Sequence, residues 1–158
     1  MRLGLTLHLT DRSIDIRELA VAAEQRGFSS IWIPGHTHIP TSRATPPPGG
    51  GSELDDEYPR SPDPWVSLAA AAAVTDRIRL GTGVALVAQH DPIVLAKVVA
   101  RVAALPAGRG ALGVRHRWHR DGMAHHGLDH STPPARASAP RLDINALAAD
   151  GGAEVHGA

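Results

Sequence analysis

Short apolar segments alternate with helix-forming segments along the first part of the chain, and this alternation restricts the fold more than any other feature. The strand-like runs lie at residues 3–8, 30–33, 78–84 and 111–114. Strands that alternate with helices are typical of a parallel sheet with crossover helices. Once the long Pro- and Gly-rich segment at 35–62 is set aside, the strands recur at roughly the thirty-residue length of a βα unit.

The ends of the predicted helices are marked by residues that cap helices. Asp15 precedes the first helix as an N-cap, and Gly27 ends it. The dipeptide Asp-Pro occurs at 63–64 and again at 91–92, and each copy places an acidic N-cap before a proline at the first helical position, where the missing N–H costs nothing. These dipeptides predict helices at about 64–75 and about 92–105.

The composition excludes several classes of function. The 158 residues carry sixteen basic and sixteen acidic side chains, and Lys97 is the only lysine, so the clustered cations that contact nucleic acid are absent. No apolar run reaches the roughly 18 residues of a membrane span, and the first residues lack the features of a signal peptide. Without cysteine, disulfides and thiolate nucleophiles are excluded. We therefore expect a cytoplasmic protein that acts on a small molecule, with no nucleic-acid and no membrane partner.

Two α/β architectures remain open at this point. Four βα units fit an open doubly wound sheet or half of an eight-unit barrel, which has about 250 residues in total. A dinucleotide-binding sheet needs a Gly-rich turn after its first strand, but residues 7–12 read LHLTDR and contain no glycine. A nicotinamide-binding Rossmann domain is therefore disfavoured.

The sequence changes in character after residue 114. Arg and His dominate residues 115–120, and three prolines between 133 and 140 interrupt the region where a fourth crossover helix would begin. We expect at most a short helix at 142–149 and no regular structure at 151–158.

Several motifs occur in the order and at the distances found in one enzyme family. They are SIWIPGHTHIP at 30–40, DP at 63–64 before an Ala-rich helix, TDRIRLGTGV at 75–84, and DP with LAK at 91–97. Over about residues 1–105 the chain resembles the N-terminal half of the luciferase-like monooxygenase family, and more closely its members that use the deazaflavin coenzyme F420. The resemblance implies a partial (β/α)8 TIM barrel of about four βα units, with the cofactor across the C-terminal ends of the strands.

The resemblance also implies an activity and two catalytic candidates. Family members transfer a hydride between F420, or alternatively FMN, and an organic substrate, in some cases with oxygen insertion. His36 and His38 follow the second strand, where the family has a histidine near the reactive ring, and imidazole suits proton transfer near neutral pH. Gly35 stands where the family has an acidic residue.

Five further residues are candidates for cofactor binding. Thr82, Gly83 and Val84 resemble the family segment that forms a backbone bulge beneath the cofactor ring, and backbone without side chains can approach a planar ring closely. His8 at the end of the first strand and Gly113 in the fourth strand complete the set. As alternatives, the glycines of the third strand ease a tight barrel strand, and the histidines are solvated loop residues.

The fourth strand departs from the family pattern. Arg115 and Arg117 stand where glycines are expected, whereas Trp118 and Asp121 still match. An unpaired charge is costly to bury, so we expect little cofactor contact from this strand.

A cluster of histidines after the fourth strand raises the possibility of a metal site. The cluster consists of His116, His119, His125, His126 and His130. Imidazole is a common ligand of zinc and nickel. Gly122 and Gly127 are expected to interrupt any helix that would present these ligands, so we assign no metal ligand and favour sequence drift.

These observations divide the chain into residues 1–114, the N-terminal half of a luciferase-like barrel, and residues 115–158, a divergent tail of low order. Half a barrel leaves a strand edge and a sheet face uncovered, which favours self-association. The main hypothesis is therefore a truncated oxidoreductase that by itself binds F420 weakly or not at all. The alternative is a non-catalytic fragment that acts only as a homodimer through the exposed sheet edge, or with a complementary half.

Overall fold

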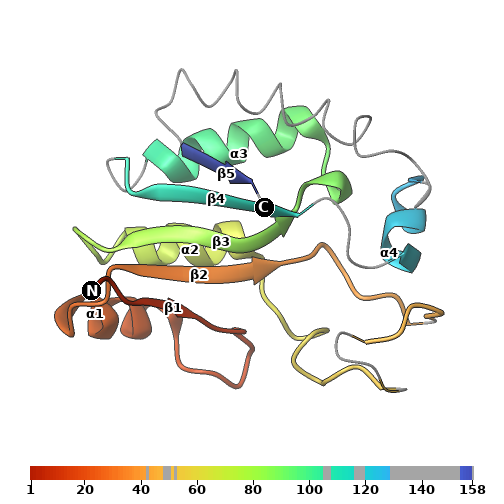
Figure 1. Cartoon of the computed structure of the whole chain (residues 1–158), viewed down its shortest axis with the longest axis horizontal. Coiled ribbons are helices and arrows are strands. Elements are labelled where there is room, and N and C mark those ends of the chain that lie inside the picture. Colours follow the sequence, from red (N-terminus) through yellow and green to blue (C-terminus); the bar gives the residue numbers. More distant parts are fainter. Residues whose placement is uncertain are drawn as a thin grey trace.

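A single parallel sheet organises the part of the chain that the computed structural model describes, which is residues 1–41, 43–47, 51, 53–104, 108–115, 120–128 and 154–157. The five strands follow in chain order across the sheet (Figure 1). They are β1 (Gly4–Thr6), β2 (Ser30–Gly35), β3 (Arg79–Leu86), β4 (Gly110–Arg115) and β5 (Glu154–Gly157), and every neighbouring pair is parallel.

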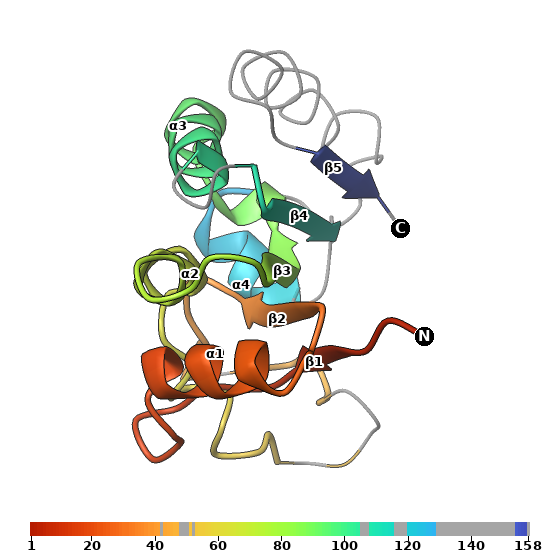
Figure 2. The same cartoon turned by 90° about the vertical axis from the view of Figure 1, so that its left-hand side faces the viewer.

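Helices follow the first four strands, as the alternation of the sequence predicts. They are α1 (Ile16–Gln25), α2 (Pro64–Ala72), α3 (Pro92–Ala104) and α4 (Arg120–His125), and a short 3-10 turn, η1 (Val87–Gln89), follows β3. Figure 2 shows α1, α2 and α3 side by side on one face of the sheet. Four parallel βα units of this kind match part of a TIM barrel, so the predicted fold class is confirmed.

The predicted helix caps are confirmed by hydrogen bonds. Asp63 Oδ1 accepts from the backbone N–H groups of the second and third residues of α2, at 2.8 and 3.0 Å. Asp91 Oδ1 does the same for α3, at 3.0 Å in both cases. Asp15 caps α1, and Gly27 ends that helix at a φ of 79°, where a residue with a side chain would be strained.

The hydrophobic core lies between the sheet and these three helices. Alternate strand residues point into it, and Ile31, Leu80 and Leu112 are each at most 2% exposed. The other face of the sheet carries Trp32, whose indole lies across Gly81. A Cβ on Gly81 would lie 2.5 Å from the ring, so close approach of this indole explains that glycine.

Two strands run further than their sequences suggest. The apolar run at 30–33 predicts a second strand that stops before Pro34, whereas β2 includes Pro34 and Gly35, and β3 continues to Leu86. The register shifts between Ile33 and Gly35 in β2, and again in β3. Such irregularities accommodate a proline inside a sheet because the ladder is already interrupted there.

The C-terminal region differs from expectation in two places. Residues 154–157 form β5, beginning with Glu154 opposite Ala111 of β4, where the sequence analysis expects no structure. Without β5, the outer edge of β4 would have unpaired backbone N–H and C=O groups, and residues 154–157 pair with them. Such pairing depends on the distant strand β4, so the four-residue sequence itself does not predict it. The expectation that Gly122 interrupts any helix in this region is wrong, because α4 includes Gly122. The helix predicted at 142–149 lies outside the described residues.

Candidate functional site

A cavity of about 240 Å³ opens at the C-terminal ends of the strands. Its lining comes from the loop after β1, the ends of β2, β3 and β4, and the long loop before α2. The lining residues are His8, Pro34, Gly35, His36, Tyr58, Gly83, Val84, Leu86 and Arg115. Parallel strands bring their carboxyl ends to one edge of a sheet, which is why residues so far apart in the sequence meet here.

Tyr58 connects the two histidines of this cavity. Nε2 of His36 lies 2.9 Å from the backbone carbonyl oxygen of Tyr58. A carbonyl oxygen only accepts hydrogen bonds, so Nε2 of His36 carries a proton in this arrangement. The ring of His8 packs edge-on against the ring of Tyr58 at 5.1 Å between centroids. Nδ1 of His8 is buried and has no hydrogen-bond partner within the described part of the chain.

Gly83 and Val84 supply backbone and one apolar side chain to the cavity wall. They lie where the register of β3 shifts, between Thr82 and Ala85, and the peptide bond that joins them is cis. The sequence analysis predicts a backbone bulge at this segment, and the register shift agrees with it. A Cβ on Gly83 would lie 2.9 Å from Cβ of Trp32, so packing inside the protein also accounts for this glycine.

Thr82 and Gly113, also predicted to bind cofactor, do not line the cavity. Thr82 is completely buried, and its Oγ1 donates to the backbone oxygen of Gly113 at 2.8 Å and accepts from its N–H at 3.1 Å. These two bonds join β3 to β4. Neighbouring strand residues point to opposite faces, so a cavity reached by Gly83 is not reached by the side chain of Thr82.

His38 likewise lies away from the cavity lining and contacts α4 instead. Its Nε2 lies 2.9 Å from Nδ1 of His125, with the two rings stacked at 5.0 Å. Nε2 of His126 lies 2.8 Å from Oγ1 of Thr37. The structure thus separates two histidines that are only two residues apart, His36 at the cavity and His38 at the helix.

The hydrogen bonds around Thr37 indicate which ring nitrogens of His38, His125 and His126 carry a proton. Oγ1 of Thr37 donates to Oε1 of Gln89 at 3.3 Å, so Nδ1 of His38 and Nε2 of His126 must each donate to Oγ1. His38 then accepts at Nε2 from Nδ1 of His125. Partial desolvation, with the nearby His38 and His125, lowers the pKa of His126 below its usual value. The lowered pKa favours the neutral form of His126.

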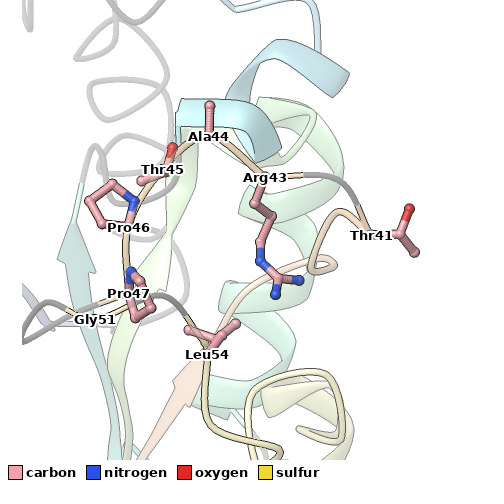
Figure 3. Close-up of a pocket in the computed structure, with 8 residues that line it drawn as sticks. All are labelled: Thr41, Arg43, Ala44, Thr45, Pro46, Pro47, Gly51 and Leu54. Atoms are coloured by element: carbon pink, nitrogen blue, oxygen red, sulfur yellow. The ribbon is translucent and has the colours of Figure 1, made fainter.

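A carboxylate of α4 also holds the long loop. Oδ2 of Asp121 accepts from the backbone N–H groups of Ala44 and Thr45, at 3.1 and 2.9 Å. The loop encloses a separate hollow of about 340 Å³. Figure 3 shows the guanidinium of Arg43 pointing into that hollow, where Arg43 also donates to the carbonyl oxygen of Pro40 at 2.9 Å. Residues predicted to carry chemistry are absent from its lining.

The histidines do not form a metal centre in the region that can be described, where no group of three or more acidic or imidazole side chains is arranged to hold an ion. His125 and His126 belong to this region, and the other three members of the predicted cluster lie outside the described residues. In the same region, no helix is long and apolar enough to cross a membrane.

Sequence reasoning missed several lining residues. Tyr58 is the only tyrosine of the chain, but nothing local marks a loop residue as part of a site formed by distant strands. The sequence predicts that the charge of Arg115 would be buried without a partner, which is energetically unfavourable. Its side chain is exposed and lines the cavity, so that cost does not arise. Its position at the end of a parallel strand is the signal that could have found it.

The parallel βα units match part of an α/β barrel, and the cavity lies at the C-terminal ends of the strands, the face that carries the chemistry in barrel enzymes generally. The chain belongs to the luciferase-like monooxygenase family, whose model matches residues 4–138.

Relatives of known sequence agree with this assignment. An uncharacterised protein of Mycobacterium tuberculosis is 48% identical over 138 residues, which cover 86% of this chain and 48% of that protein. A phthiodiolone/phenolphthiodiolone dimycocerosates ketoreductase of a Mycobacterium species is 32% identical over 127 residues, covering 78% of this chain and 33% of the ketoreductase. The chain thus spans about half the length, or less, of these curated relatives.

Solved structures share the fold. A monooxygenase from Streptomyces bottropensis superposes with a TM-score of 0.70 at 26% identity, over 91% of this chain and 42% of that one. The oxygenating constituent of a Pseudomonas putida 3,6-diketocamphane monooxygenase, in complex with FMN, gives 0.66 at 22% identity over 93% and 38%. An F420-dependent secondary alcohol dehydrogenase gives 0.67 at 20% identity over 91% and 41%.

Proposed function

We propose that the cavity serves a luciferase-like oxidoreductase that transfers a hydride between F420, with FMN as the alternative, and an organic substrate. The observation that carries the proposal is the convergence of His8, His36 and the Gly83–Val84 backbone at the C-terminal ends of the strands. Structural relatives bound to FMN and to an F420 adduct support both cofactors.

The residues of the cavity fit the ring part of such a cofactor. The Gly83–Val84 segment brings backbone to the wall, and the buried Nδ1 of His8 is a polar atom that still needs a partner. The cavity of about 240 Å³ is smaller than the roughly 300–1,000 Å³ of typical ligand pockets. If the described residues form one wall of a ring site, this chain alone is expected to bind the cofactor weakly or not at all.

His36 is the side chain best placed for proton transfer. A bound F420 or FMN supplies the hydride chemistry, and the proton that accompanies a hydride must be held by the protein or by water. With Nε2–H donated to the Tyr58 carbonyl, the neutral ring takes up a proton at Nδ1. The Tyr58 carbonyl thus does for His36 what the missing acidic residue at Gly35 would do, because it fixes the tautomer and the ring orientation.

A matched pair of loop histidines tests this proposal. Absorbance and fluorescence titrations with F420 and with FMN measure cofactor affinity for the purified chain. His36→Ala is expected to weaken binding by roughly tenfold, because a wall of the cavity is lost. His38→Ala, two residues further along but outside the cavity, is the control and should leave affinity unchanged. Absence of binding of either cofactor by the wild-type chain would contradict the proposal.

A second candidate function is association with another copy of the chain. The helices α1, α2 and α3 cover one face of the sheet (Figure 2). Trp32 lies on the other face, with its Nε1 donating to Oγ of Ser30 at 3.0 Å. β1 forms one edge of the sheet, and Leu3 beside it is 52% exposed. A homodimer through this edge should dissociate on Leu3→Lys substitution in sedimentation experiments. A monomeric wild-type chain would contradict it.

A further inference from the structure

We infer that the cavity selects an anionic substrate, one that carries a carboxylate or phosphate group, and that Arg115 pairs with that group. The inference rests on the proposed function, since it names the substrate class of the same site.

Arg115 is placed in the cavity by the pairing of the last two strands that reach it. It lies opposite Leu86 at the ends of β4 and β3, and both residues line the cavity. The side chain is exposed, so the guanidinium is available to a ligand. Among the described residues, the lining includes two histidines and a tyrosine but no aspartate or glutamate.

Several arginines of the chain are paired, whereas Arg115 has no hydrogen-bond or ion-pair partner among the described residues. Arg12, Arg17 and Arg60 form ion pairs with aspartates at 2.7 to 3.0 Å. Arg43 and Arg109 donate to backbone carbonyl oxygens. Within the ranges that the structure describes, no carboxylate or carbonyl oxygen is bonded to the guanidinium of Arg115. A cation in a concave site without a counter-charge creates a positive potential that attracts an anion.

His8 is an independent indication of a missing polar ligand. Its Nδ1 is buried in the same cavity wall without a hydrogen-bond partner among the described residues. Buried polar atoms are nearly always paired, and a neutral imidazole can donate from Nδ1. A planar guanidinium binds carboxylates and phosphates through two parallel hydrogen bonds. An anionic oxygen group is an acceptor for both kinds of donor, the guanidinium of Arg115 and an Nδ1–H of His8.

Two sources could supply such an oxygen group, the substrate or the phosphate of FMN. In barrel enzymes the cofactor phosphate is frequently held by the loops after the seventh and eighth strands, which are distant from the end of the fourth. Arg115 belongs to the fourth strand and lines the same cavity as His8 and His36. This position favours the substrate as the source.

Benzoate and benzamide form a probe pair that differs in charge but hardly in shape. Calorimetric titration of the wild-type chain should show tighter binding of benzoate than of benzamide. Arg115→Gln should weaken benzoate binding by about 10- to 100-fold, the usual effect of losing a charged hydrogen bond, and leave benzamide binding unchanged. Arg115→Lys should retain part of the preference. Arg101→Gln, at an exposed arginine of α3, is the control and should have no effect.

The outcomes are distinct. Equal affinities for the two probes, undetectable benzoate binding at the highest soluble concentration, or an unchanged Arg115→Gln variant would each overturn the inference. A parallel titration with FMN and riboflavin, which lacks the phosphate, identifies the source. If Arg115→Gln weakens FMN but not riboflavin, the anion belongs to the cofactor and the substrate inference is wrong. Benzoate selectivity without any cofactor binding would instead refute the proposed function.

Discussion

The two ends of the sheet hold hollows of different kinds. At the N-terminal ends of the strands, a hollow of about 460 Å³ is lined by arginines together with Glu24. Glu24 accepts three backbone N–H groups just before β3, at distances down to 2.6 Å, and Arg109 donates to two carbonyl oxygens at 2.7 Å. At the C-terminal ends, Nδ1 of His8 and the guanidinium of Arg115 have no recorded partner in the described part of the chain.

Under the proposed function, this difference assigns stability to the N-terminal end of the sheet and ligand binding to the C-terminal end. Polar groups that pair with the protein's own backbone hold the chain together, whereas polar groups left for a ligand stabilise nothing until that ligand binds. In barrels generally, the N-terminal face contributes stability and the C-terminal face carries chemistry. The following substitutions should affect one end and spare the other.

Replacing Glu24 should have the largest effect on stability. Burial raises the pKa of Glu24, but the backbone N–H groups of Ile78, Arg77 and Asp76 outweigh it and keep the pKa below its usual value. Glu24→Ala leaves these donors without their acceptor and should lower the free energy of unfolding by about 1–3 kcal/mol. Urea denaturation measures this loss, with Glu18→Ala at an exposed position of α1 as the control. Cofactor affinity of the folded variant should be unchanged.

Thr82→Val should cause the next largest loss of stability. The substitution keeps the shape of the side chain but leaves the N–H of Gly113 without its acceptor in a buried place, at a cost of about 1–2 kcal/mol. Thr82→Ser retains the hydroxyl and should retain most of the stability. A valine variant that is as stable as the wild type but does not bind F420 would instead support the prediction that Thr82 contributes to cofactor binding.

Asp121→Ala should have a smaller and more local effect. The carboxylate accepts from the backbone N–H groups of Ala44 and Thr45, so its removal frees the middle of the long loop. We expect about 1 kcal/mol of global stability to be lost and the loop to be cleaved faster by proteases. Asp55→Ala, within the same loop, serves as a comparison. Unaltered cleavage would argue against α4 as the support of the loop.

The smallest expected effect is a pH dependence at the C-terminal end. The pKa of His126 is lowered from 6.5 by partial desolvation and by His38 and His125, and the pKa of His90 is lowered mainly by burial. The unfolded chain therefore binds more protons as the pH falls through about 6.5, so stability present above that value is lost below it. Urea midpoints from about pH 7.5 to about pH 5.5 should decline. The decline should be shallower in His126→Gln, and an unchanged slope would contradict this origin.

Local sequence accounts for most of the fold. The Asp-Pro dipeptides and Asp15 predict where helices begin because a cap and the helix it serves are only a few residues apart. The candidate site was predicted less completely. His8, His36, Gly83 and Val84 lie at the cavity, but the positions of His38 and Thr82 depend on which way each side chain points at an irregular strand end.

The sequence by itself determined the alternation of strands and helices, the caps and the sheet end at which the candidate cavity lies, since these follow from neighbouring residues and from the direction of parallel strands. Only the tertiary structure decided that Tyr58 joins His8 and His36, that α4 holds the long loop, and that Arg115 opens into the cavity. The physical reason is distance along the chain. Contacts between residues far apart in sequence depend on register shifts and packing that leave no local pattern to be read.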